Sequence, residues 1–164
     1  MVIENSSKDS DYVTLIKKED IEVTGNTGDQ LMDEFFNSTT TYDNSKLKKY
    51  LNSVTNTIPV KLKEVNGYKI RLITVEEIMK NDNNWTYDKT YDYYTYNGNN
   101  SNISTFIGLT MTNPKCTEGK CSAFYVVGAA YNDNQKATYY IDHWASGLPQ
   151  IKPVINVYKT ELDK

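Results

Sequence analysis

Apolar and polar residues alternate most clearly near the end of the chain, over residues 151–157. A period of two is typical of a half-buried strand, so this segment predicts a closing β-strand with Ile155 in the core. Pro153 has no N–H group to donate, which places it at an edge, at a bulge or in the first residues of the strand. A strand this late must pair with an earlier one, and residues 68–75 and 124–131 are the candidates.

A helical period appears in two stretches of the first half of the chain. Apolar residues four positions apart predict a helix over residues 29–36. A stripe at i, i+3, i+4 and i+7 predicts a second helix over residues 47–54, capped near Asn44. Thr74 followed by Glu77 is a capping box, which predicts a third and shorter helix. The sequence therefore predicts two or three short helices.

Short strand patterns occupy much of the remaining sequence. Asn66 and Gly67 form a tight-turn signal between two of them. Residues 137–141 are expected to return as the hairpin partner of residues 123–131. The other expected strands are residues 12–16, 60–64, 68–73 and 103–111.

Length and composition are those of one folded domain. Of the 164 residues, 38% are hydrophobic and 24% are charged, so we expect a single domain over residues 1–164 with residues 1–10 disordered. The elements predict an α+β fold in which short helices pack on a twisted, mostly antiparallel sheet. The formal net charge is −3 without a basic stripe, which argues against a nucleic-acid partner. No apolar run is long enough for this segment to insert into a membrane.

Residues 81–102 are polar, rich in tyrosine and poor in aliphatic residues. A segment of this composition is not expected to bury itself as regular structure, so we predict a long irregular loop with Trp85 as its anchor in the core. Long ordered loops on a rigid scaffold are where binding residues concentrate. The chain has 14 tyrosines and a single arginine, Arg71, a mixture that an AT-rich genome would also produce.

The two cysteines, Cys116 and Cys121, are separated by four residues in the sequence CTEGKC. A disulfide between them would close a short loop and contribute on the order of 2 kcal/mol. It would also indicate an oxidising, extracellular setting. Free thiols and a metal-binding or catalytic pair remain open, although His143 is the only histidine and a redox motif prefers two intervening residues.

Four motifs resemble segments of a bacterial surface-domain family with a C-type-lectin-like fold, a family of unknown function common in Gram-positive gut bacteria. Residues 67–77, GYKIRLITVEE, are similar to its GYKVRLLTxEE segment, and residues 149–157, PQIKPVINV, are similar to its closing YGVRPVINL strand. Residues 109–114 and 123–128 resemble its YWTMSP and AWYVNSNG segments. Lys152 stands where the family usually has arginine, and the cysteine loop is an insertion.

The resemblance implies a C-type-lectin-like fold, a compact scaffold that presents a long loop region for ligand contact. It also implies an extracellular, surface- or pilus-associated protein whose pilin-like anchor is separate, so that this chain is the soluble ectodomain. We therefore expect a non-catalytic recognition or adhesion module for a glycan or a protein ligand, with pilus subunits as further partners. The expected ligand-binding residues are aromatic, because flat rings suit sugar and protein faces: Trp85, Tyr91, Tyr93, Tyr94, Tyr96 and Trp144.

Three alternatives remain beside this expectation. The aromatic residues could serve only to pack the loop against the core. Oxygen donors over residues 82–92 could bind calcium, but the chain lacks the EPN and WND signatures of sugar-binding C-type lectins, so we expect no metal and no cofactor. A related branch of the fold, the formylglycine-generating enzymes, uses a cysteine pair with copper, so a redox or copper-dependent enzyme is the alternative function. A single histidine offers little acid–base machinery, and we expect no enzyme.

Overall fold

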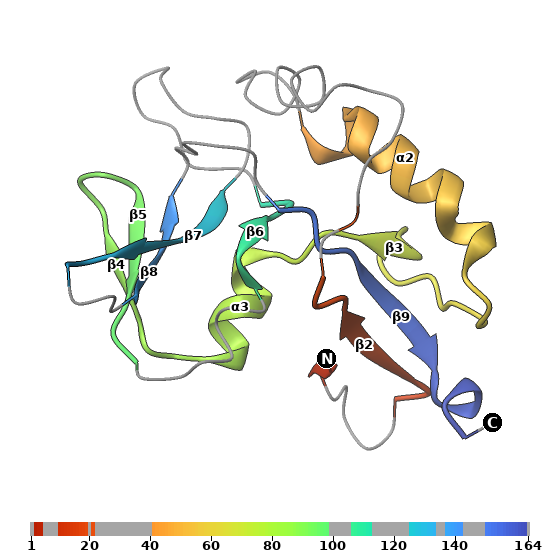
Figure 1. Cartoon of the computed structure of the whole chain (residues 1–164). Coiled ribbons are helices and arrows are strands. Elements are labelled where there is room, and N and C mark those ends of the chain that lie inside the picture. Colours follow the sequence, from red (N-terminus) through yellow and green to blue (C-terminus); the bar gives the residue numbers. More distant parts are fainter. Residues whose placement is uncertain are drawn as a thin grey trace.

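The computed structural model describes residues 2–4, 10–19, 21, 41–98, 106–112, 125–133, 137–142 and 150–163. In these parts of the chain the protein is α+β, with two antiparallel sheets and two short α-helices (Figure 1). The α+β class is confirmed, although the strands form two sheets rather than one. The expected helix over residues 29–36, both cysteines, His143 and Trp144 lie outside the described residues.

The four-stranded sheet brings early and late strands of the chain together. Its strands in spatial order are β1 (Val2–Glu4), β2 (Tyr12–Ile16), β9 (Val154–Tyr158) and β3 (Ile70–Arg71). All neighbours are antiparallel, and β9 lies between β2 and β3 (Figure 1). The closing strand and its pairing with the 68–75 segment are therefore confirmed. The alternative pairing with residues 124–131 is wrong, because that segment contributes to the other sheet and β2 occupies the second side of β9.

Strand β9 contributes to two cores because successive strand residues point to opposite faces. Val154 is fully buried in one core together with Ile16. Ile155 packs against the other core and is only partly buried, which is less than the sequence predicted. Pro153 directly precedes the strand rather than lying in its first residues, and its carbonyl oxygen accepts a hydrogen bond from the N–H of Lys17 at 3.0 Å.

Helix α2 (Lys46–Val54) packs beside β3 (Figure 1). Its apolar stripe is confirmed, since Leu47 and Leu51 are fully buried in the second core. The cap, expected near Asn44, is the next residue, Ser45. Ser45 has extended backbone angles and its Oγ accepts a hydrogen bond from the first turn of the helix, whereas Asn44 belongs to a preceding 3₁₀ turn.

Helix α3 (Val75–Asn81) begins with the predicted capping box. The N–H of Glu77 donates to Thr74 Oγ1 at 3.1 Å, and the N–H of Thr74 donates to the Glu77 carboxylate at 2.9 Å. Arg71 donates two further bonds to this carboxylate, at 2.7 and 2.5 Å, and the two side chains are only 12% and 13% exposed. This ion pair ties the start of α3 to strand β3.

The five-stranded sheet is built mainly from two hairpins. Its strands in spatial order are β4 (Trp85–Asp88), β5 (Tyr93–Tyr96), β8 (Ala137–Asp142), β7 (Val126–Tyr131) and β6 (Gly108–Leu109). The β7–β8 hairpin confirms the pairing expected from the sequence. Val127 of β7 and Ile141 of β8 are fully buried and share a core with Ile78 of α3, so the helix covers one face of this sheet.

The expectation of an irregular loop over residues 81–102 is wrong where the structure describes this segment. Strands β4 and β5 form a hairpin in which Trp85 lies opposite Tyr96 and Tyr87 lies opposite Tyr94, and β5 also pairs with β8. The segment has few aliphatic residues, but tyrosine and tryptophan favour strands and bury large ring areas. Trp85 packs against the core, as predicted for the anchor of this segment.

The ends of two other predictions need correction. Residues 2–4 are not disordered, because their backbone pairs with β2 as strand β1. The strand expected over residues 68–73 is limited to the two residues of β3.

The turn before β3 is confirmed. Asn66 and Gly67 have φ angles of 52° and 82°, the left-handed values that a two-residue hairpin turn requires.

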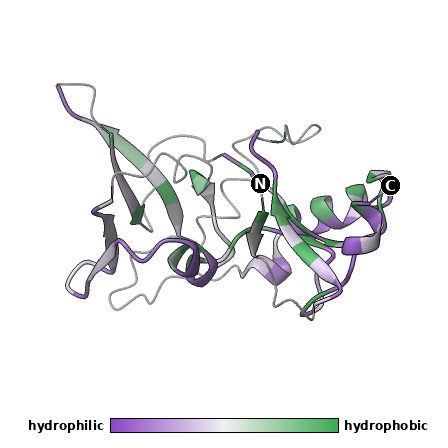
Figure 2. Cartoon of the chain, turned by 90° about the horizontal axis from the view of Figure 1, so that it is seen from below, coloured by the Kyte–Doolittle hydropathy of each residue, from purple (hydrophilic) through white to green (hydrophobic). Residues whose placement is uncertain are grey.

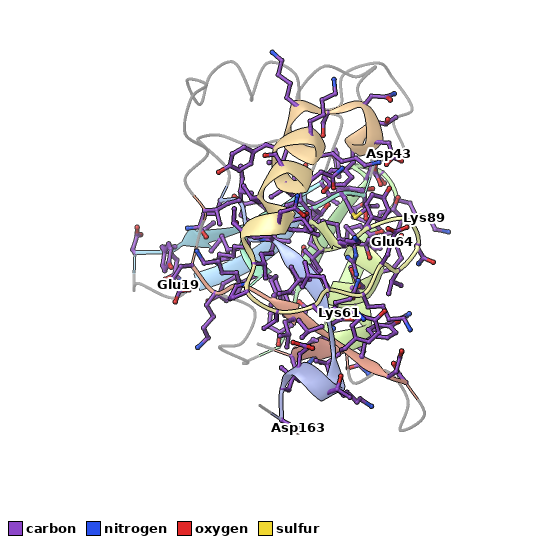
Figure 3. All side chains as sticks on the ribbon, turned by 90° about the vertical axis from the view of Figure 1, so that its right-hand side faces the viewer. Glu19, Asp43, Lys61, Glu64, Lys89 and Asp163 are labelled. Carbon is purple, nitrogen blue, oxygen red and sulfur yellow. The ribbon has the colours of Figure 1, made fainter. Side chains whose placement is uncertain are left out.

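Hydropathy follows this architecture. The hydrophobic positions lie mainly along the strands, whereas the connecting turns are hydrophilic (Figure 2). Within the described ranges, no helix combines the length and the apolar character needed to cross a membrane. Charged side chains of both signs lie around the outside of the molecule (Figure 3), and the labelled examples are Glu19, Asp43, Lys61, Glu64, Lys89 and Asp163.

Candidate functional site

The β4–β5 hairpin divides the predicted ligand-binding tyrosines between the two faces of the five-stranded sheet. Tyr94 lies opposite the fully buried Ile141, whereas the next residue, Thr95, lies opposite Tyr140. Successive strand residues point to opposite faces, so Tyr94 is on the face that packs on the core and Tyr93 is on the other. We call these the core face and the outer face.

On the core face, Trp85 and Tyr96 close the base of the hairpin. Their ring centroids are 5.1 Å apart, and the hydroxyl of Tyr96 donates to Asp82 Oδ2 at 2.6 Å. The Tyr96 ring also lies over Gly98, where an added Cβ would come within 2.3 Å of the phenolic oxygen. These contacts hold the hairpin to the end of α3, so both rings have a structural role in this geometry.

On the outer face, Tyr93 and Tyr140 form a stacked pair from adjacent strands. Their ring centroids are 6.1 Å apart, with 20° between the ring planes. The Tyr140 ring lies against the backbone of β7, since an added Cβ at Gly128 would be 2.5 Å from the ring. Both tyrosines are half-buried, so part of each stays open to solvent. We call this pair of nearly parallel, partly exposed rings the Tyr93–Tyr140 platform.

Short polar side chains surround the platform. On β4, Thr86 lies opposite Thr95 and Asp88 lies opposite Tyr93, so all four share the outer face. Thr138 is two residues before Tyr140 on β8 and is on the same face. The side chains of Thr86, Asp88 and Thr138 are exposed. Thr86 Oγ1 accepts a hydrogen bond from Asn97 Nδ2 at 2.7 Å, and Asp88 Oδ1 accepts one from the N–H of Thr90 at 2.8 Å. A polar ligand on the rings could be bound through Asp88 Oδ2 and the hydroxyl of Thr138.

A second cluster lies on the core face at the turn end of the hairpin, around Asp92. The hydroxyls of Tyr87 and Tyr125 both donate to Asp92 Oδ1, at 2.7 and 2.6 Å. The first of these bonds, together with burial, raises the pKa of Tyr87 to about 12. The Tyr94 ring is next to both tyrosines, with its centroid 4.6 Å from that of Tyr87 and 5.9 Å from that of Tyr125. Asp92 Oδ2 is buried and has no hydrogen-bond partner.

The other predicted residues that the structure describes do not join either cluster. Tyr91 is exposed in the turn between β4 and β5. Among the oxygen donors considered for calcium, Asp82 is already used: its Oδ1 accepts from the backbone and side chain of Asn84, and its Oδ2 accepts from Tyr96. Within the described ranges, no three Asp, Glu, His or Cys side chains are grouped so that they could hold a metal ion.

Sequence reasoning missed Tyr140, Gly128 and Tyr125. The position of Tyr140 could have been found, because the predicted strand over residues 137–141 places it on the face opposite Ile141. Its stacking on Tyr93 could not, because that contact depends on the hairpin that was predicted to be a loop. The two clusters therefore emerge only from the pairing of β5 with β8.

The comparisons with known proteins add no relative. No protein-family model, no curated protein and no solved structure matches this chain. The functional argument therefore rests on the geometry of the two clusters.

Proposed function

We propose that this protein is a non-catalytic recognition module that binds a glycan on the Tyr93–Tyr140 platform. The observation that supports this most is the pair of parallel, half-exposed rings fixed on the outer face of the five-stranded sheet. A sugar ring presents C–H groups on one face, and these carry partial positive charge. The faces of aromatic rings carry partial negative charge, so the two surfaces attract each other.

The fixed position of Tyr140 favours binding. Its ring already lies against Gly128, so little side-chain freedom is lost when a ligand covers it. The hydroxyls of Thr95 and Thr138 and the carboxylate of Asp88 are at the edge of the platform and can pair with sugar hydroxyls. A flat apolar surface with a polar edge matches the two chemical faces of a sugar.

We also propose that the module acts outside the cell as part of a surface- or pilus-associated protein with a C-type-lectin-like fold. The support is the set of motifs over residues 67–157. The two antiparallel sheets and short helices are compatible with that fold.

The test is a glycan array probed with the folded protein, followed by calorimetry with any glycan that binds. Tyr140→Ala is expected to weaken binding at least about fivefold, because stacking of a ligand ring on an aromatic side chain contributes ~1–3 kcal/mol. Tyr131→Ala is the matched control, since Tyr131 is an exposed tyrosine at the far end of the same sheet. Equal loss in both variants, or binding only to proteins on a host-protein array, would contradict the proposal.

Gly128→Ala gives a second test that leaves both tyrosines in place. The new Cβ would meet the Tyr140 ring at 2.5 Å, so the ring must tilt away from the sheet. We expect glycan binding to weaken while the protein remains folded. Unchanged affinity in a folded variant would show that the flat position of Tyr140 is not part of the site.

A further inference from the structure

The cluster around Asp92 contains a carboxylate oxygen whose hydrogen-bonding capacity is unused. Tyr87 and Tyr125 both donate to Oδ1, while Oδ2 is buried and has no donor. Most buried polar atoms have a hydrogen-bond partner, so an unpaired one needs an explanation such as a bound group. No ion pair joins Asp92 to a lysine or arginine in the part of the chain that the structure describes.

The surroundings of this oxygen are suited to a cation. The Tyr94 ring is in contact with the rings of both Tyr87 and Tyr125, and the faces of such rings attract positive charge. Burial raises the pKa of Tyr94, and the negative charges of Asp92 and Glu76 raise it further. Glu76 is exposed, and among the described residues its carboxylate accepts a hydrogen bond only from the hydroxyl of Thr112, at 3.3 Å.

We propose that Asp92, Tyr87, Tyr94 and Tyr125 form a binding site for a primary ammonium group, supplied by a lysine side chain of a protein partner. The ammonium donates one hydrogen bond to Asp92 Oδ2 and another to the hydroxyl of Tyr94, and its charge lies against the tyrosine rings. The alkyl chain of the lysine then leads out beside Tyr87, which is the most exposed of the three rings at 38%. Tyr125, at 3% exposure, forms the base of the site.

The chemistry favours a primary ammonium over other occupants. A water molecule could donate to Oδ2 but would leave the negative charge of the carboxylate unbalanced. A quaternary ammonium would suit the rings but has no hydrogen to donate to Oδ2. A divalent metal ion prefers several oxygen ligands around it, and the described residues offer no group of three acidic side chains here.

Access to Oδ2 requires one group to move. Because the oxygen is buried, we expect the Tyr87 ring, the most exposed of the three, to turn outward and give up its bond to Oδ1 when the ammonium binds. Tyr125 keeps its own bond to Oδ1 in this rearrangement and continues to hold the carboxylate in place. Asp92 itself has a left-handed backbone conformation, with φ of 51°, which fixes its direction at the turn.

The site is separate from the glycan platform. Tyr94 and Tyr93 are adjacent in sequence and point to opposite faces of the sheet. The inference therefore goes beyond the proposed glycan binding and does not depend on it. Tyr140→Ala is expected to leave ammonium binding unchanged, so failure of one proposal can be told from failure of the other.

The test is an NMR titration of the ¹⁵N-labelled protein with Nα-acetyl-lysine methylamide. Saturable shifts are expected at Asp92, Tyr94 and Tyr125. The norleucine analogue has the same alkyl chain without the charge and should produce no saturable shifts there, and the Nε-trimethyl analogue should bind at least about tenfold more weakly. Equal shifts with norleucine, or shifts that map elsewhere, would overturn the proposal.

Asp92→Asn removes the charge and keeps an acceptor for the two phenols. We expect lysine affinity to fall about tenfold or more, the effect of losing a hydrogen bond to a charged group. Asp88→Asn, an exposed aspartate of the same hairpin on the outer face, should change it less than about twofold. If Asp92→Asn does not fold, Tyr94→Phe serves instead, and its affinity should still fall. Unchanged affinity in the folded variant would refute the site.

Discussion

Replacing Glu77 with glutamine should remove the interaction that fixes α3 to β3. The carboxylate accepts two bonds from Arg71 and one from the N–H of Thr74. Glutamine keeps one acceptor oxygen, but its amide NH₂ group is itself a donor and would face the donors of Arg71 or Thr74. The change also leaves Arg71, whose side chain is 12% exposed, without its counter-charge. Lost charged hydrogen bonds cost about 1.5–3 kcal/mol, and loss of the acidic residue in the first turn adds about 0.3–1. We expect the free energy of unfolding to fall by about 2–4 kcal/mol.

The effect should depend on pH in a defined direction. Burial raises the pKa of Glu77, but the hydrogen bonds and charge of Arg71 outweigh it, so the pKa of the folded protein lies below its ordinary value. Because the pKa of Glu77 is lower in the folded protein, this group stabilises the fold fully at pH values above its unfolded pKa, about 4.3. That stabilisation is lost as the pH falls through the folded pKa. The difference between wild type and Glu77→Gln should therefore be largest above about pH 6 and shrink below about pH 4.

Urea unfolding followed by circular dichroism at several pH values measures this difference. Glu76→Gln is the matched control, because Glu76 is in the same helical turn but is exposed, and its carboxylate accepts a long hydrogen bond from Thr112, at 3.3 Å. It should cost less than about 1 kcal/mol at every pH. A loss below about 1 kcal/mol in Glu77→Gln, or a difference that does not change with pH, would refute the assigned role of the ion pair.

Three further outcomes test the fold and the cysteines. Ile155→Ala should cost about 2–3 kcal/mol in denaturant unfolding, near the lower end for a buried isoleucine because the side chain is only partly buried; a loss under about 1 kcal/mol would contradict its packing in the second core. Tyr94→Ala should cost about 3 kcal/mol and Tyr93→Ala less than about 1, because they point to opposite faces, and equal costs by thermal melts would contradict that assignment. Cys116 and Cys121 are predicted to be bonded to each other. Their double serine variant should stay folded with a modestly lower Tm, whereas two free thiols in mass spectrometry of unreduced protein would contradict the bond.

The features that the sequence predicted well depend on local rules. The capping box of Thr74 and Glu77, the turn at Asn66 and Gly67, and the β7–β8 hairpin each follow from residues close together in the chain. Their geometry is set by neighbouring backbone groups, so distant contacts do not need to be known. Arg71 stands out in the sequence as the only arginine, but its ion pair with Glu77 was not predicted.

The features that the sequence missed depend on tertiary contacts. The β4–β5 hairpin was predicted to be a loop because its apolar surface comes from rings rather than aliphatic side chains, and Tyr94 and Tyr96 alternate in it as strand residues do. Its faces become defined only when β5 pairs with β8. For this reason the sequence predicted a single binding surface that included both Tyr93 and Tyr94. In the structure the two residues lie on opposite faces of the five-stranded sheet.

The central position of β9 has a consequence for the order in which the protein can fold. Thr14 Oγ1 donates to Asn156 Oδ1 at 2.9 Å across 142 residues, and β9 lies between β2 and β3 in the sheet. Pairing of such distant segments is slow, because a long loop must close before any contact forms. During synthesis, the β4, β5, β7 and β8 strands emerge before β9 and can pair first. The four-stranded sheet cannot form until β9 has been synthesised. In a ribosome-bound chain that ends before Val154, the backbone edges of β2 and β3 that pair with β9 should therefore be unpaired and open to chaperones.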